Sequence, residues 1–198
     1  MDSSLKNIMI VGVGGQGTLL ASRIIGNVAI KAGYDVKVSE VHGMSQRGGS
    51  VVTYVKYSKD GVNSPIVTEG MADIVLAFEA LEAYRSIEFL KDGAKLIANN
   101  QKINPMPVIT GQATYPVDIM EKIKNKGISL IELDALSLAI AAGNQKAVNV
   151  ILIGVLAAIL KDFNKSDWID VMKSTVPAKF LDVNLTAFES GYALGDTY

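Results

Sequence analysis

The sequence predicts an α/β protein: a Rossmann-like, mostly parallel sheet with helices on both faces and a helical layer at its C-terminal end. Three observations lead to this prediction. A short apolar strand over residues 7–13 runs directly into a glycine-rich turn, and a helical pattern follows at once. Strand-like and helical segments then alternate as far as residue 133, which is typical of a parallel sheet. From residue 135 onward the pattern is helical to the end.

Composition limits the classes of protein to consider. The 198 residues fit one domain over 1–198, and a net charge of −1 provides no basic surface for nucleic acid. The absence of cysteine excludes disulfides, thiolate metal sites and iron–sulfur ligation in this chain, and it is compatible with a reducing cytoplasm. The N-terminus lacks the pattern of a signal peptide, and the longest apolar run is shorter than the ~20 residues of a membrane span. We therefore expect a cytoplasmic protein without a membrane segment.

The first half of the chain shows the alternation clearly. Apolar side chains recur at helical spacing over 18–32, and Gly33 is a normal helix stop. Residues 35–39 alternate as a strand does, and 40–49 are rich in glycine and polar residues and indicate a loop. Residues 50–57 are β-branched or aromatic at most positions, which predicts a strand.

The second half continues the same pattern. We expect a strand at 73–78, a helix at 80–90, and strands at 94–98 and 128–133. Pro116 suits the first position of a helix, so we expect one from there to Asn125.

The C-terminal helices are expected to break near Gly143, Asn164 and Pro177. The run 147–160 is apolar except for Asn149, so it predicts a buried helix that is covered on more than one face, by its own chain or by a partner.

The glycine turn is the first candidate site. Gly12, Gly14 and Gly17 have the G-x-G-x-x-G spacing: the first allows a tight turn, the second lets backbone approach a phosphate or other group, and the third lets helix pack on strand. The free N–H groups of the following helix favour an anion over the turn.

A second glycine-rich segment is expected at the same edge of the sheet, because parallel strands bring their carboxyl ends together there. In this segment, residues 40–49, His42 has two interpretations. It is either a proton shuttle or hydrogen-bond donor to an anion, or a loop histidine that hydrogen-bonds its own turn. Arg47 is suited to a phosphate or carboxylate, or else bridges backbone carbonyls.

Three further residues have two interpretations each. Glu79 and Glu82 are placed for acid–base work, although a carboxylate at a helix N-terminus is also an ordinary cap, which we favour for Glu82. Asn149 is either a satisfied core amide or a contact to a bound group, and we favour the former.

Three segments together resemble a known family. They are Gly12–Gly17 (GVGGQG), Ser39–Ser50 (SEVHGMSQRGGS) and Asp73–Glu79 (DIVLAFE), and Asn149–Gly154 also fits. In this order they resemble the gamma-type subunits and domains of the 2-oxoacid:ferredoxin oxidoreductases, in particular the beta subunits of the indolepyruvate enzymes. The resemblance implies oxidative decarboxylation of arylpyruvates to aryl-acetyl-CoA with reduction of ferredoxin. It places thiamine diphosphate and the iron–sulfur clusters on a partner alpha subunit, so this chain is expected to hold no metal and to be inactive alone.

The resemblance also suggests a crevice that faces the alpha subunit and its coenzyme A. His42 would hydrogen-bond substrate or partner backbone there, and Arg47 would neutralise phosphate or position a carboxylate. The residues expected to line it, for coenzyme A or for interface contacts, are Gly12, Gly14, Gly15, Gln16, Gly17, Ser45, Gln46, Arg47, Gly48 and Gly49, and the catalytic candidates are Arg47, His42 and Glu79.

Two alternatives remain open from the sequence. One is a stand-alone oxidoreductase that binds NAD or flavin, with Glu40 as the ribose ligand. The other is a non-catalytic assembly module, suggested by the apolar helix.

Overall fold

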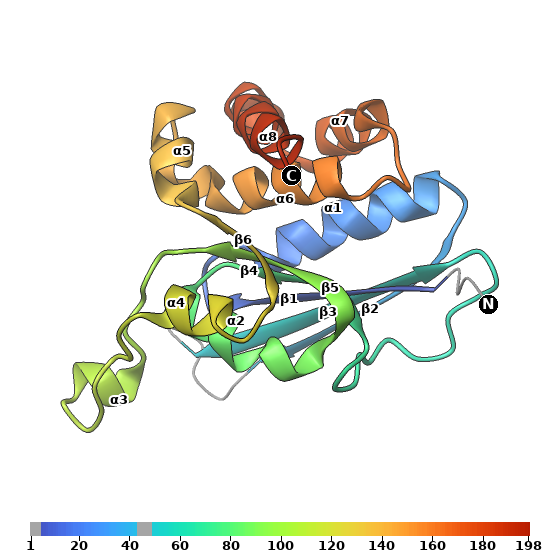
Figure 1. Cartoon of the computed structure of the whole chain (residues 1–198). Helices are drawn as coiled ribbons and strands as arrows, with labels where there is room; N and C mark the ends of the chain where they lie inside the picture. Colours follow the sequence, from blue (N-terminus) through green and yellow to red (C-terminus); the bar gives the residue numbers. More distant parts are fainter. Residues whose placement is uncertain (1–4, 43–48) are drawn as a thin grey trace.

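The computed structural model describes residues 5–42 and 49–198, and a six-stranded sheet lies at its centre (Figure 1). The strands are β1 (Lys6–Val13), β2 (Asp35–His42), β3 (Ser50–Ser58), β4 (Ala72–Ala77), β5 (Leu90–Asn99) and β6 (Ser129–Leu133). Their order in the sheet is β2-β3-β1-β4-β5-β6. β3 is antiparallel to both of its neighbours, whereas β1–β4, β4–β5 and β5–β6 are parallel pairs. The predicted α/β fold with a mostly parallel sheet is confirmed.

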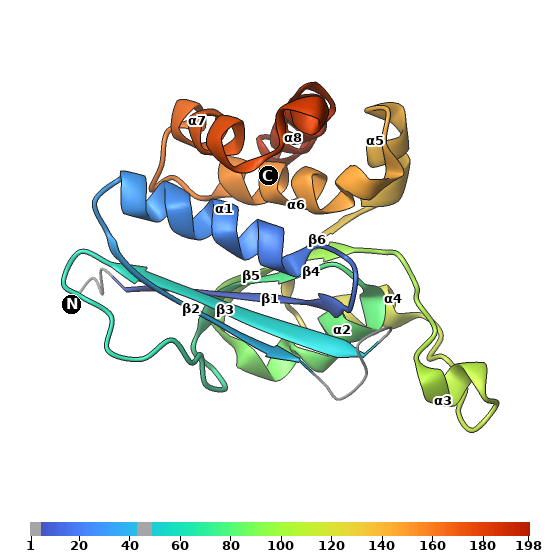
Figure 2. The ribbon, with the colours of Figure 1, turned by 180° about the vertical axis from the view of Figure 1, so that it is seen from behind.

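Helices cover both faces of this sheet, as Figures 1 and 2 show from opposite sides. The α-helices are α1 (Thr18–Lys31), α2 (Ala80–Arg85), α3 (Met106–Ile109), α4 (Ile119–Lys124), α5 (Ala135–Ala141), α6 (Val148–Ile159), α7 (Lys165–Thr175) and α8 (Leu181–Gly195). Short 3-10 turns occupy Ile87–Phe89, Gln145–Ala147 and Ala178–Phe180. α1 and α6 lie on one face, with α7 and α8 stacked outside them, and α2 and α4 lie on the other. Each face has its own apolar core, and the larger one includes the C-terminal helices.

The apolar helix is buried, as expected from the run 147–160. Every residue of α6 from Asn149 to Ala158 is buried, because the sheet and α1 cover one side and α8 covers another. α6 and α8 approach very closely where glycines face backbone: an added Cβ at Gly154 would lie 2.3 Å from the Phe188 carbonyl oxygen. The cover comes from this chain itself, so the helix offers no surface to support the assembly-module alternative.

Three element boundaries differ from the prediction. β2 continues to His42 instead of ending at Ser39, because its ladder with β3 pairs His42 with Val51. The helix expected over 80–90 ends at Arg85, and Leu90 already starts β5. The helix expected from Pro116 begins only at Ile119, after Asp118 adopts a left-handed conformation with φ 55°. Among the described residues, no helix has the length and apolar character needed to cross a membrane.

Candidate functional site

The glycine turn after β1 and the start of β3 meet at one edge of the sheet. β2 runs in the same direction as β1, and the antiparallel β3 begins where β2 ends, so Gly49 lies beside the turn. The Gly14 N–H donates to the Gly49 carbonyl oxygen at 3.0 Å. Gly49, a described residue of the second glycine-rich segment, therefore lies at the same edge as the turn, as expected. Because this bond engages the Gly14 N–H, that group is not available to the phosphate or other group expected to approach the turn at Gly14.

Gln16 stabilises the turn through its side chain. Its Oε1 accepts from the Val13 N–H at 2.8 Å, and its Nε2 donates to the Phe78 carbonyl oxygen at 3.0 Å. The amide thus ties the end of β1 to the residue after β4. Gly12 leaves room for it, because an added Cβ there would lie 2.8 Å from Gln16 Oε1.

Gly17 has a different role from the helix–strand packing expected of it. Its φ of +83° is left-handed, and an added Cβ would lie 2.6 Å from the Asn149 side-chain nitrogen. That Asn149 Nδ2 donates to the Gly17 carbonyl oxygen at 3.4 Å, and Asn149 is buried. The third glycine therefore lets α1 start beside α6. Asn149 is a buried amide with a hydrogen bond to this turn, and it also lines the hollow at the start of α6.

A hollow of about 480 Å³ opens between the glycine turn and the start of α6. Its lining residues are Gly15, Gln16, Gly17, Gln101, Ile103, Leu136, Gln145, Lys146, Val148 and Asn149. Neither α1 nor α6 has a side-chain cap at its N-terminus, so the first N–H groups of both helices remain without that partner. Two helix N-termini and the Lys146 amine give this hollow a positive character.

Glu79 is a buried structural carboxylate. It is 1% exposed and caps α2, because one of its oxygens accepts from the Glu82 N–H at 2.9 Å. Its other oxygen accepts from the Ile103 N–H at 3.0 Å and from the Tyr115 hydroxyl. Burial, and then the adjacent Glu79 carboxylate, raise the pKa of Tyr115 above its ordinary value. The N-cap of α2 is thus Glu79, whose two oxygens are both engaged, whereas Glu82 lies in the first turn of the helix, where a carboxylate suits the helix dipole.

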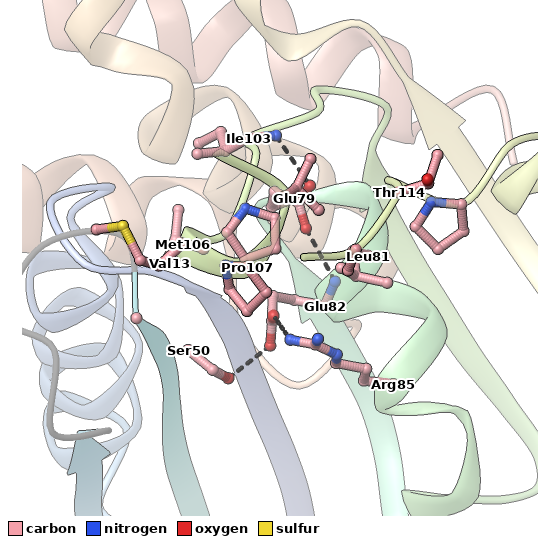
Figure 3. Close-up of a pocket in the computed structure, with 15 residues that line it drawn as sticks. Val13, Ser50, Glu79, Leu81, Glu82, Arg85, Ile103, Met106, Pro107 and Thr114 are labelled. Atoms are coloured by element: carbon pink, nitrogen blue, oxygen red, sulfur yellow. Dashed lines mark hydrogen bonds and ion pairs between the residues drawn. The ribbon is translucent and has the colours of Figure 1, made fainter. Parts of the chain in front are cut away.

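Glu82, like Glu79, lines a second hollow of about 470 Å³ (Figure 3). It lies between Ser50, whose hydroxyl donates to it at 2.6 Å, and Arg85, whose guanidinium donates at 2.7 Å. Ser50, Arg85 and Tyr115 were not candidates from the sequence. The i, i+3 spacing of Glu82 and Arg85 on a helix was the one available signal.

The arrangement at Glu40 argues against the dinucleotide alternative. In a dinucleotide-binding sheet the second strand lies directly beside the first, and its acidic tip reaches the ribose. Here β3 separates β1 from β2. The Glu40 carboxylate accepts hydrogen bonds from Thr53 at 2.9 Å and from Thr18 at 3.4 Å, so it already has a structural role.

Four candidates, Ser45, Gln46, Arg47 and Gly48, lie outside the described residues, and so does the side chain of His42, the last residue of β2. Their roles stay predictions. Within residues 5–42 and 49–198, no group of histidine and acidic side chains is arranged to hold a metal ion.

Comparisons with known proteins agree with this geometry. The family model described as pyruvate ferredoxin/flavodoxin oxidoreductase matches residues 7–194. The chain is 46% identical to indolepyruvate oxidoreductase subunit IorB of Thermococcus kodakarensis and 44% identical to that of Pyrococcus horikoshii, in each case over 93% of both chains. The fold is similar to a keto/oxoacid ferredoxin oxidoreductase gamma subunit from Geobacter sulfurreducens, with a TM-score of 0.73, 22% identity, and coverage of 98% of this chain and 99% of that one. The chain therefore belongs to the pyruvate ferredoxin/flavodoxin oxidoreductase family.

Proposed function

We propose that this chain is the subunit of an indolepyruvate:ferredoxin oxidoreductase that carries no redox cofactor. The observation that carries the proposal is the near full-length similarity to the two IorB subunits. In the overall reaction an arylpyruvate loses its carboxyl group as CO₂, its acyl group joins the coenzyme A thiol, and the electrons pass to ferredoxin. We place the assembly in the cytoplasm.

The chemistry of the donor set supports a division of labour between subunits. Iron–sulfur clusters need thiolate ligands, and this sequence has no cysteine. The magnesium that accompanies thiamine diphosphate needs grouped oxygen ligands, and the described residues offer no such acidic group. We therefore assign the thiamine diphosphate and the clusters to a partner alpha subunit, and we assign to this chain one wall of the reaction chamber.

The hollow beside the glycine turn is our candidate for the coenzyme A contact. Lys146 and the starts of α1 and α6 suit a diphosphate, and Gly15, with φ +97° and no atom within 4 Å of its Cβ position, leaves space for one. Lys146 would neutralise part of the phosphate charge, and the glycine turn would form the wall of the hollow beside the diphosphate.

Coexpression with the cysteine-rich alpha subunit of the same genome tests the function. We expect a stable complex that reduces ferredoxin with indolepyruvate and coenzyme A, and no turnover by either subunit alone. No arylpyruvate-dependent reduction by the purified pair would contradict the proposal. For the coenzyme A contact, Lys146→Ala should raise KM for coenzyme A without changing KM for indolepyruvate, and Lys126→Ala, an exposed lysine elsewhere, is the control.

A further inference from the structure

Residues 103–117 form an arm that projects from the body of the protein. In both ribbon views its helix, α3, stands apart from the sheet and the other helices (Figures 1 and 2). Three large apolar side chains on the arm are exposed: Met106 is 57% exposed and lines the rim of the hollow that contains Glu82, and Ile109 and Val117 are 66% and 64% exposed. A projecting element that exposes several large apolar side chains is typical of an interaction site.

The arm also lacks charge. None of the residues 103–117 is Asp, Glu, Lys or Arg, although 20% of the whole chain is charged. Charged side chains are depleted at the centres of protein interfaces and enriched on free surfaces. An exposed, uncharged segment therefore suits a lasting contact with an apolar, weakly charged surface. It does not suit a transient contact steered by charge, or a nucleic acid.

The shape of the arm is fixed by hydrogen bonds within this chain. Hydrogen bonds within it close a compact loop: the N–H groups of Gln112 and Ala113 both donate to the Pro107 carbonyl oxygen, at 2.8 and 3.0 Å, and the Thr110 N–H donates to the Met106 carbonyl oxygen at 2.9 Å. Because the loop is already ordered, binding through it costs little conformational entropy.

A single carboxylate fixes the base of the arm to the sheet edge. Glu79 accepts from the Ile103 N–H at the beginning of the arm and from the Tyr115 hydroxyl near its end. Glu79 follows β4, so the arm is held at the edge that also carries the glycine turn. A surface bound to the arm would lie against that edge.

We propose that the arm is a preformed docking element for the cofactor-bearing alpha subunit, and that Glu79 is the positioning residue that fixes it. This inference rests on the proposed function, because the alpha subunit is the lasting partner which that function requires. The site on the alpha subunit is expected to be an apolar groove of low charge that takes Met106 and Ile109.

The test measures the affinity of the full chain for the alpha subunit by calorimetry. Met106→Asp and Ile109→Asp should each weaken pairing at least about tenfold, since a charge would be buried against an apolar groove. Ile30→Asp is the matched control: Ile30 is 59% exposed, but it lies at the far end of α1. It should pair as the unsubstituted chain does. Circular dichroism and the melting temperature establish that all three variants are folded.

The role of Glu79 is tested through Tyr115, which donates a hydrogen bond to it. Tyr115→Phe removes one hydrogen bond to Glu79 and leaves the exposed face of the arm unchanged, so we expect pairing weakened about twofold to fivefold with an unchanged KM for indolepyruvate in the assembled enzyme. Glu79→Gln should show the same pattern more strongly.

The outcomes separate the two proposals. If the unsubstituted chain pairs and the Met106 and Ile109 variants pair equally well, the docking role is wrong and the proposed function stands. If these variants instead convert a homodimer to a monomer, the arm joins two copies and the inference is overturned. If the unsubstituted chain does not bind the alpha subunit, both proposals fail.

Discussion

At the scale of single residues, the roles of Glu79 and Glu82 show what sequence spacing leaves open. Both acids fit the start of α2, and either can accept hydrogen bonds from the first N–H groups of a helix. The choice depends on Ile103 and Tyr115, which reach Glu79 from more than twenty residues away along the chain. These long-range partners are set by the path of the arm, which no local pattern reveals.

The two left-handed glycines of the turn allow a matched prediction. Gly15→Ala and Gly17→Ala should each lose about 1–2 kcal/mol of unfolding free energy, since an L-residue is strained at their φ values of +97° and +83°. Gly17→Ala should lose more, because its Cβ would also lie 2.6 Å from the Asn149 side chain whereas that of Gly15 meets nothing within 4 Å. Urea denaturation measures both.

A double variant that adds Asn149→Ala extends that experiment. In the Gly17→Ala background it should recover part of the excess loss, because it removes the atom that the new Cβ meets. Equal unfolding free energies for the Gly15 and Gly17 variants would show that the close approach of α1 and α6 adds nothing to the loss at Gly17.

Asp134 gives a prediction about pH. The Ser137 hydroxyl donates to its carboxylate at 2.6 Å and the Ser137 N–H at 3.0 Å, and these bonds hold the pKa of Asp134 below 3.8. Its contribution to the stability of α5 is therefore complete above about 3.9, the usual pKa of an unfolded aspartate, and is lost as the pH falls through the lower folded-state pKa. An NMR titration should give a midpoint below 3.8 for this carboxyl. Ser137→Ala should move the midpoint back up, and an unmoved midpoint would contradict this cause.

At the scale of elements, periodicity located most strands and helices, and long-range pairing decided the rest. The apolar run of α6 and the β-branched run of β3 are strong local signals, and both elements occur where expected. The direction of β3 is a different matter, because an antiparallel strand has the same composition as a parallel one. β2 extends to His42 because β3 pairs with it, although its last residues resemble a polar loop. Asp118 delays α4 through a backbone conformation that non-glycine residues seldom adopt.

The contact between α6 and α8 predicts that alanine lowers the unfolding free energy at Gly191 of α8 but raises it at Gly26 of α1, which lies outside this contact. Gly191→Ala should cost about 3 kcal/mol or more, since the new Cβ would lie 2.0 Å from the Ile151 carbonyl oxygen and the helices would have to separate. Gly26→Ala on α1 is the control. Its Cβ would meet only Val36 and Val38, each at 3.6 Å, so the change should stabilise the protein by about 0.5–1 kcal/mol. Thermal and urea unfolding measure both, and destabilisation of similar size at the two sites would contradict the interpretation.

At the scale of the whole molecule, the sequence predicted which backbone segments meet better than it predicted what their side chains contact. Glycine spacing marked the turn after β1, and Gly49 lies beside that turn as expected. The antiparallel direction of β3, which brings Gly49 there, was not predicted. The hollow at Lys146 and the hollow beside the arm were not foreseen, because each is lined by segments from distant parts of the chain. Lys146 also precedes an apolar helix, where a lysine indicates only the end of a buried run.

The C-terminal helices and the sheet should unfold as one unit. An aromatic cluster joins them: Tyr57 on β3 contacts Tyr34 and Phe163, and Phe163 contacts Trp168 on α7. The Tyr57 hydroxyl also donates to Asp162 at 2.8 Å, in the connection between α6 and α7. Trp168 is the one tryptophan of the sequence and is fully buried, so its fluorescence reports on the helical layer while far-UV circular dichroism reports on the whole chain.

We expect the two signals to give coincident thermal transitions, as a single domain over 1–198 requires. Tyr57→Phe should lower both midpoints together, by about 2–4 °C, because it removes one bond between the layers and leaves the ring packing in place. Ser190→Ala, on α8 and outside this cluster, is the control and should shift neither midpoint appreciably. A tryptophan transition that precedes the circular dichroism transition would mean that the helical layer detaches first. In that case the layer would be a separate folding unit, and the arm and the glycine turn would keep their shared edge after its loss.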